Sequence, residues 1–191
     1  MDHAALLISS LQSSKSFGNR LAAAALSHSG ENVAFDPSYY KIAYPNGDVP
    51  ANKGMAADVL VRCYRAMNID LQVLVHEDMT KDFRPYPQLW KASAPDTNID
   101  HRRIPNLQRF FEHKGQTLTS SRNPADYLPG DIVVLELGNS EPHIGIIVPG
   151  PGNRANEMWV VHNIGAGVKW ENVLCDYSIQ RHFRFPADGA Q

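Results

Sequence analysis

The sequence predicts an α+β domain in which N-terminal helices pack on an antiparallel sheet. Two observations lead to this class. Apolar residues recur at helical spacing in several segments before residue 114, whereas short apolar runs separated by turn residues follow from Tyr127 onward. Short strands joined by short turns favour an antiparallel meander. The fold class therefore follows from the order of the two patterns along the chain.

Helical segments are expected at five places before residue 114. The first helical segment, over 4–28, has high helix propensity. We expect a break in it near Ser16-Phe17-Gly18, and Gly30 can end it. Asp70 is a suitable N-cap for the helix expected over 71–83. The expected helices cover 4–28, 55–67, 71–83 and 104–113, and a short helix or turn is expected over 36–40. Between them, the stretch 84–103 shows no period, and a connection of this length is often functional.

Four strands are expected in the second half of the chain. They are separated by turns rich in glycine, proline, asparagine and serine. Their ranges are 132–135, 143–148, 158–163 and 178–185. The domain organisation that follows is an N-terminal helical segment over 1–30 and a single domain over 31–191.

The bulk composition excludes several classes of protein. The chain has 191 residues and a formal net charge of −2, so no basic field points to nucleic acid. No apolar run approaches the roughly 20 residues that cross a bilayer. The N-terminus lacks the features of a signal peptide, so either the protein is not exported by that route or the chain is a mature form with an added Met. Cys63 and Cys175 form either one bridge or two separate thiols.

Two histidines mark the edge of the expected sheet. His143 opens one strand and His162 lies near the end of the next, so the two could lie side by side. A catalytic histidine needs such a partner to fix its tautomer. The alternative is that both are merely polar residues at strand ends.

The start of the expected helix over 55–67 is where a nucleophile would be placed. A helix N-terminus carries free N–H groups and partial positive charge, which stabilise a thiolate or an oxyanion. Ala56 occupies the first turn and can do no chemistry. Cys63, two turns further along the apolar stripe, is better explained by core packing.

Several segments together resemble a bacterial family catalogued as domain of unknown function 1287. The resemblance covers nearly all of the chain after about residue 30. It rests on the segments 35–37, 43–50, 70–72, 75–79, 96–103, 128–133, 143–147 and 162–167. That family looks like a branch of the papain-like NlpC superfamily of cell-wall cysteine peptidases, which implies a papain-like NlpC-type fold.

The resemblance also implies roles for individual residues. Cys would be expected where Ala56 stands, with His143 as its base and His162 orienting that base. Three explanations of Ala56 remain open: a Cys→Ala substitution that silences an enzyme, a natural pseudoenzyme that only binds cell wall, and a nucleophile shifted to Cys63. Candidate substrate-binding residues are Arg102, Arg103, Asp58, Tyr44 and Asn163.

The two arginines have a chemical reason to be candidates. A guanidinium binds carboxylates through a bidentate fork, and peptidoglycan stem peptides are rich in carboxylates. The alternative is an intramolecular pair with Asp96 or Asp100. His76, Glu77 and His101 have no metal-ligand spacing, so neither a metal nor another cofactor is expected.

The resemblance implies a peptidoglycan hydrolase that cleaves an amide bond in stem peptides, acting in the periplasm or after secretion. With Ala56 in place, the chain itself is expected to be inactive. Its expected partners are peptidoglycan or muropeptides, and an immunity or inhibitor protein if it is a secreted toxin. The alternative of another class is a non-catalytic module that binds cell-wall fragments or a partner protein.

Overall fold

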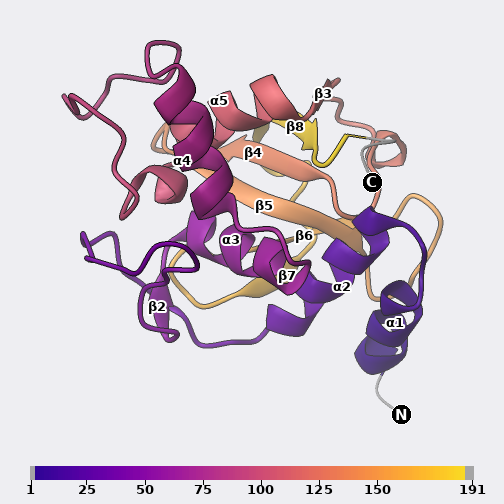
Figure 1. Cartoon of the computed structure of the whole chain (residues 1–191). Helices are drawn as coiled ribbons and strands as arrows, with labels where there is room; N and C mark the ends of the chain where they lie inside the picture. The colour runs from indigo at the N-terminus through magenta and orange to yellow at the C-terminus, as the bar shows by residue number, and fades with distance from the viewer. Residues whose placement is uncertain (1–2, 188–191) are drawn as a thin grey trace.

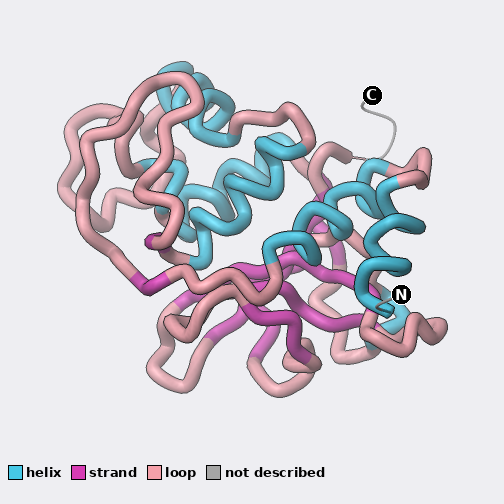
Figure 2. The backbone as a smooth tube through the Cα atoms, turned by 90° about the horizontal axis from the view of Figure 1, so that it is seen from below, coloured by secondary structure: helices cyan, strands magenta, loops and turns pink. Residues whose placement is uncertain are grey.

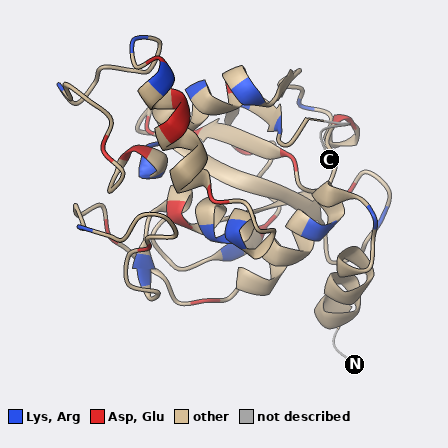
Figure 3. Cartoon of the chain, in the orientation of Figure 1, with Lys and Arg blue, Asp and Glu red and all other residues tan. Residues whose placement is uncertain are grey.

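The computed structural model describes residues 3–187 and has two layers (Figure 1). Helices gather on one side of a twisted sheet, as the view from below shows (Figure 2). The predicted α+β class with an antiparallel sheet is confirmed. Among the described residues, no helix is both long and apolar enough to span a bilayer. Lys and Arg are interspersed with Asp and Glu along the chain (Figure 3).

The N-terminal helices break where the sequence indicated. Helix α1 covers His3–Gln12 and helix α2 covers Phe17–His28. The hydroxyl of Ser16 accepts a hydrogen bond from the backbone N–H of Asn19, which caps α2. Leu7 and Leu11 of α1 and the alanine-rich face of α2 belong to the same apolar core as the sheet. The part of the N-terminal segment that the structure describes, residues 3–30, thus shares its core with the rest of the chain.

Helix α3, Ala56–Ala66, begins at a tightly built turn. The Asp58 carboxylate accepts the N–H of Met55 at 2.6 Å, which satisfies a donor that precedes the helix. Gly54 has φ +151°, and a Cβ on it would lie 2.9 Å from Cβ of Asp58. Only glycine fits this backbone beside the capping carboxylate. At the other end, Asn68 has φ 60° and ends the helix.

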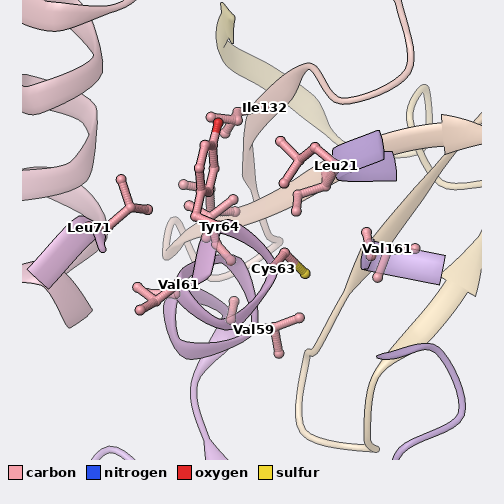
Figure 4. Close-up of a cluster of buried hydrophobic side chains, with 14 of the residues drawn as sticks. Leu21, Val59, Val61, Cys63, Tyr64, Leu71, Ile132 and Val161 are labelled. Carbon is pink, nitrogen blue, oxygen red and sulfur yellow. The ribbon is translucent and has the colours of Figure 1, made fainter. Parts of the chain in front are cut away.

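Cys63 lies in the core of the molecule (Figure 4). Its side chain is fully buried among apolar neighbours from α2, α3 and the sheet. Burial raises the pKa of the Cys63 thiol to about 12. Both cysteines are free, so of the two arrangements that the sequence left open, the structure has separate thiols. Cys63 is a packing residue and not a reactive one.

The remaining helices agree with the sequence except in one segment. Helix α4 covers Leu71–Lys81 and is capped by Asp70, and helix α5 covers Ile104–Lys114. The long connection before α5 is irregular until a 3₁₀ turn, η1, over Asp100–Arg102. A short helix or turn was expected over 36–40, and neither forms there. The Asp36 carboxylate instead accepts bonds from the Ser38 N–H and the Tyr40 hydroxyl, which hold an open loop.

The sheet has six strands in the order β3-β8-β4-β5-β6-β7, all antiparallel to their neighbours. The predicted meander holds for β4 to β7 but is wrong for the last strand. β8 crosses back to pair with β4, and β3 then pairs with β8. The strand bounds are Gln116–Leu118 for β3, Ile132–Glu136 for β4, Pro142–Pro149 for β5, Met158–His162 for β6, Lys169–Glu171 for β7 and Ser178–Arg184 for β8.

Three short elements complete the fold. Strands β1, Ala34–Phe35, and β2, Lys53–Gly54, pair in parallel just before α3. A 3₁₀ turn, η2, covers Pro124–Asp126. The sequence missed β1, β2, β3 and β7 because two or three residues carry no recognisable alternation.

Both faces of the sheet are covered. Ile132, Ile144 and Val161 face the helices in the main core. Residues of opposite parity, such as Val133, Ile147 and Val160, form a second apolar cluster on the other face. A sheet that is buried on both faces explains why β5 is a continuous apolar run.

A buried polar cluster joins β4 to β8. Asp131 accepts hydrogen bonds from His182 at 2.7 Å and from Arg184 at 2.7 Å. Burial alone would raise the pKa of Asp131, but these two donors lower it below its ordinary value. The other ring nitrogen of His182 faces the Thr119 carbonyl. This cluster fixes β8 beside β4, and its histidine is distinct from the pair that the sequence singled out.

Candidate functional site

A cavity of about 700 Å³ opens where the start of α3 meets the ends of the central strands. Ala56 lines it from the start of α3, and His143 lines it from the start of β5. Asn163 and Ile164, which follow β6, form another wall. The other lining residues come from β1, η1, the starts of α5 and β5, and loops: Phe35, Pro37, Tyr39, Met55, Trp90, Ile99, Arg102, Arg103, Ile104, Pro105, Leu137, Glu141, Pro142 and Gly165. The residues expected to be nucleophile and base therefore share one cavity.

Three side chains form a hydrogen-bonded chain that leads into this cavity. Nε2 of His143 lies 2.9 Å from Nδ1 of His162, and Nε2 of His162 lies 2.9 Å from an oxygen of Glu171. The register pairs Val160 with Glu171, so His162 and Glu171 are diagonal neighbours on one face of the sheet. The predicted contact between His143 and His162 is confirmed. Glu171 extends it to a third residue.

A glycine permits this close contact between strands. A Cβ on Gly145 would lie 2.5 Å from Cγ1 of Val160 and 3.4 Å from Cβ of His162. No side chain fits there without moving β6. Gly145 therefore lets the two histidine rings meet, with their centroids 5.1 Å apart.

The hydrogen-bond partners assign the protons on both rings. The Glu171 carboxylate only accepts, so His162 donates from Nε2 and its Nδ1 is an acceptor when the ring is neutral. His143 must then donate from Nε2 to His162. The remaining nitrogen of His143, Nδ1, carries a lone pair. This is the tautomer that a general base requires.

Burial keeps both histidines neutral. Burial first, and then the neighbouring His162, lower the pKa of His143 to about 3. Burial also lowers the pKa of His162, although the hydrogen bond to Glu171 offsets part of that effect. Near neutral pH, the His143 ring is therefore an uncharged base in the wall of the cavity.

Arg102, which lines the cavity, forms a buried ion pair with Asp58, which does not line it. Nε of Arg102 lies 2.7 Å from one oxygen of Asp58, its Nη2 lies 3.1 Å from the other, and the two side chains are 1% and 3% exposed. Arg102 also donates to the carbonyls of Ser38 and Asp36. Asp58 was expected to bind substrate, but it does not line the cavity. The intramolecular alternative holds for Arg102, with Asp58 as the partner in place of Asp96 or Asp100.

The pair has a positioning role. Asp58 caps α3 through Met55 N–H, and Arg102 fixes both that carboxylate and the loop that carries Pro37 and Tyr39. Arg102 also balances the negative charge of Asp58 beside the helix N-terminus. Uncompensated, that charge would oppose a thiolate or an oxyanion at position 56.

The other candidate residues are placed differently from one another. Arg103 lines the cavity, with its guanidinium 4.1 Å from the centre of the Trp90 ring. Asn163 also lines it, but its side chain bonds to the Val33 carbonyl and the Gly165 N–H, which shapes the turn after β6. Tyr44 lies outside the cavity and packs against His76.

Glu171 is the functional candidate that sequence reasoning missed. Its strand, β7, has three residues and follows a glycine-rich turn, so nothing in the sequence indicated that a strand returns there. The signal that could have found it is the turn over Gly165–Gly167. A hairpin after such a turn brings the residues that follow it back alongside His162.

The lowered pKa values predict how stability depends on pH. Burial lowers the pKa of His101 to about 4, as it lowers that of His143, so the unfolded chain binds protons between pH 6.5 and 5 that the folded chain does not. The free energy of unfolding should therefore fall as pH drops through this window, by roughly 1.4 kcal/mol per pH unit for each such histidine. Urea denaturation at several pH values measures this slope.

Two variants separate the contribution of His143 from a general loss of stability in acid. His143→Gln should make the slope between pH 6.5 and 5 shallower, whereas His3→Gln, at an exposed position, should leave it unchanged. Equal slopes in all three chains would show that His143 is not held neutral by the fold.

The fold and site together describe an α+β protein with a histidine pair opposite a helix N-terminus. Residues 22–185 match the model of a family described as "Domain of unknown function (DUF1287)", and the chain belongs to this family. It is similar to a protein of Escherichia coli (strain K12) named "Uncharacterized protein YijF". The two are 46% identical over 156 residues, which cover 82% of this chain and 76% of that protein. No group of three or more His, Cys, Asp or Glu within residues 3–187 is arranged to hold a metal ion.

Proposed function

We propose that this fold is the scaffold of a papain-like, NlpC-type cysteine peptidase that hydrolyses an amide bond in the peptide part of peptidoglycan, and that Ala56 makes this chain inactive. The observation that carries the proposal is that Ala56 and His143 line one cavity while His162 and Glu171 fix the tautomer of His143. A nucleophile, a base and a group that orients the base are the parts that covalent amide hydrolysis requires. Here the base and its orienting groups are present, and the nucleophile is the missing part.

The chemistry follows from these positions. A thiol at position 56 would give its proton to Nδ1 of His143, and the sulfur would attack the substrate carbonyl carbon. The backbone N–H at position 56 would help bind the oxyanion. His143 would then protonate the departing amine, which leaves a thioester. Water, deprotonated by His143, would release the acid and restore the thiol.

Ala56 itself favours a second candidate function. A chain that keeps the cavity and loses the nucleophile could act as a binding module for cell-wall fragments or for a partner protein. The hydrogen-bonded chain of Glu171, His162 and His143 argues against this, since binding alone does not need a base with a fixed tautomer.

The location and partners are part of the same proposal. A peptidoglycan hydrolase acts where its substrate lies, in the periplasm or outside the cell. If the protein is secreted against competitors, an immunity or inhibitor protein that covers the cavity is the expected partner.

The test is the Ala56→Cys variant, assayed on purified peptidoglycan and on muropeptides. The variant should release soluble fragments that carry a new free amine and a new carboxylate, whereas the unaltered chain should release none. Mass spectrometry of the fragments identifies the bond cleaved. A variant that binds muropeptides but leaves all of them intact would contradict the enzyme and favour the binding module.

A further inference from the structure

Two consecutive arginines line the cavity, and they differ in how many hydrogen bonds their guanidinium groups donate. Arg102 donates four hydrogen bonds, to Asp58 and to two backbone carbonyls. Within residues 3–187, the side chain of Arg103 makes no hydrogen bond within 3.5 Å. Its ion pair with Asp100 is 3.6 Å long, and Asp100 already accepts the N–H of Asp96. Arg103 is therefore a cation with free donors.

The position of Arg103 makes these donors available to a ligand. Its side chain is 20% exposed, and it lines the same cavity as Ala56 and His143. Cζ of the Arg103 guanidinium lies over the Trp90 ring, 4.1 Å from the centre of that ring. Stacking on an aromatic ring holds the guanidinium plane while its N–H edge stays free.

Burial of this cation is only partly compensated. Burial lowers the pKa of Arg103, and the nearby carboxylates of Asp100 and Asp96 offset part of that effect. A guanidinium with unused donors in a partly desolvated wall gains most from a bidentate anion. The cavity is otherwise lined mainly by apolar side chains, and its lining also includes the carboxylate residue Glu141.

We propose that Arg103, held over the Trp90 ring, is the subsite that binds a free carboxylate of the peptide substrate. The identification of the ligand as a peptide rests on the proposed function. A singly charged carboxylate fits better than a doubly charged phosphate, because Asp100 already lies 3.6 Å from Arg103 and Glu141 lines the same cavity. The carboxylate comes either from the end of the peptide or from an acidic side chain within it. Arg102 is not suited to this role, because four of its five N–H donors are used within the protein and its side chain is 1% exposed.

The experiment is a calorimetric titration of the unaltered chain, in which Ala56 prevents turnover. The ligands are a stem-peptide tripeptide, the same tripeptide with its terminal carboxylate amidated, and one with its side-chain carboxylate amidated. Arg103→Ala should weaken binding of the unmodified tripeptide by about 10- to 100-fold. It should have little effect on the peptide whose amidated carboxylate is the one that Arg103 binds, which identifies the source.

Two matched variants show whether the guanidinium itself matters. Arg103→Lys keeps the charge but loses the planar fork and the stacking, so its affinity should fall between those of the unaltered chain and Arg103→Ala. Arg84→Ala removes an arginine that is 91% exposed and outside the cavity, and it should bind as the unaltered chain does. Equal affinity of Arg103→Ala and the unaltered chain for every ligand would overturn the subsite. Failure of the unaltered chain to bind any of the three peptides would also overturn it.

This outcome is separable from the proposed function. Arg103-dependent binding of a carboxylate by a protein whose Ala56→Cys variant is inert on cell wall would keep the subsite and reject the hydrolase. Cleavage by Ala56→Cys that is indifferent to amidation and to Arg103→Ala would keep the hydrolase and reject the subsite.

Discussion

In the Ala56→Cys chain, replacing His143 with alanine should lower kcat/KM on muropeptides by at least about 10²–10⁴-fold, the usual contribution of a general base. The physical reason is that Nδ1 of His143 is the nitrogen left free by the bond to His162. No other ring in the described part of the cavity wall could replace it, since His143 is the one histidine among the lining residues. Steady-state kinetics on a defined muropeptide measures the loss.

The two residues behind His143 should show smaller, graded losses. His162→Ala removes the acceptor that fixes the His143 tautomer, so it should lower kcat while KM changes little. Glu171→Gln should have a milder effect, because an amide oxygen still accepts from Nε2 of His162 and Glu171 is 42% exposed. Both His162→Ala and Glu171→Gln should shift the pH dependence of kcat, which a loss of stability alone would not do.

Cys63→Ala is the matched control for these losses. Cys63 is fully buried and lies in the core, so its removal should lower stability but leave kcat/KM of the Ala56→Cys chain unchanged. If Cys63→Ala abolishes activity instead, position 56 is not the site of the nucleophile.

The second large effect is expected at the buried ion pair. Arg102→Ala leaves the carboxylate of Asp58 buried and removes the donors that hold the Asp36 and Ser38 carbonyls. The expected loss is about 3–5 kcal/mol in the free energy of unfolding, the usual cost of removing one partner of a buried pair. Urea denaturation at pH 7 measures it.

Arg84→Ala is the appropriate comparison, because its ion pair with Asp82 is exposed. That change should alter the free energy of unfolding by less than about 1 kcal/mol. Arg102→Ala should also reduce the activity of the Ala56→Cys chain, since the start of α3 loses its anchor. If Arg102→Ala is as stable as Arg84→Ala, the pair does not hold the helix start, and Arg102 would be free to bind substrate.

Much of the fold could be predicted from the sequence where elements were long. The periodicity of α3 and the apolar run of β5 located both elements to within a residue or two, because each buries an extended face. The position of β8 beside β4 could not be predicted. It depends on the long-range bonds from His182 and Arg184 to Asp131, which leave no local pattern.

The site was predictable in part for the same reason. His143 and His162 were located from their positions in two neighbouring strands, a local argument about hairpins. Glu171 was missed because β7 is too short to show alternation. The different states of Arg102 and Arg103 depend on Asp58 and Trp90, which lie far from them in sequence, so spacing along the chain could not separate the two arginines.

The proposed hydrolysis requires that the helix N-terminus and His143 activate a thiol at position 56. The most direct measurement is the pH dependence of alkylation by iodoacetamide of the thiol that Ala56→Cys introduces, with peptide mass mapping to separate it from Cys63 and Cys175. We expect the thiol at position 56 to have an apparent pKa clearly below the ordinary value of about 8.5. That pKa should return toward the ordinary value when His143→Ala is added. An apparent pKa near 8.5 that His143→Ala does not change would contradict the proposed activation of this thiol.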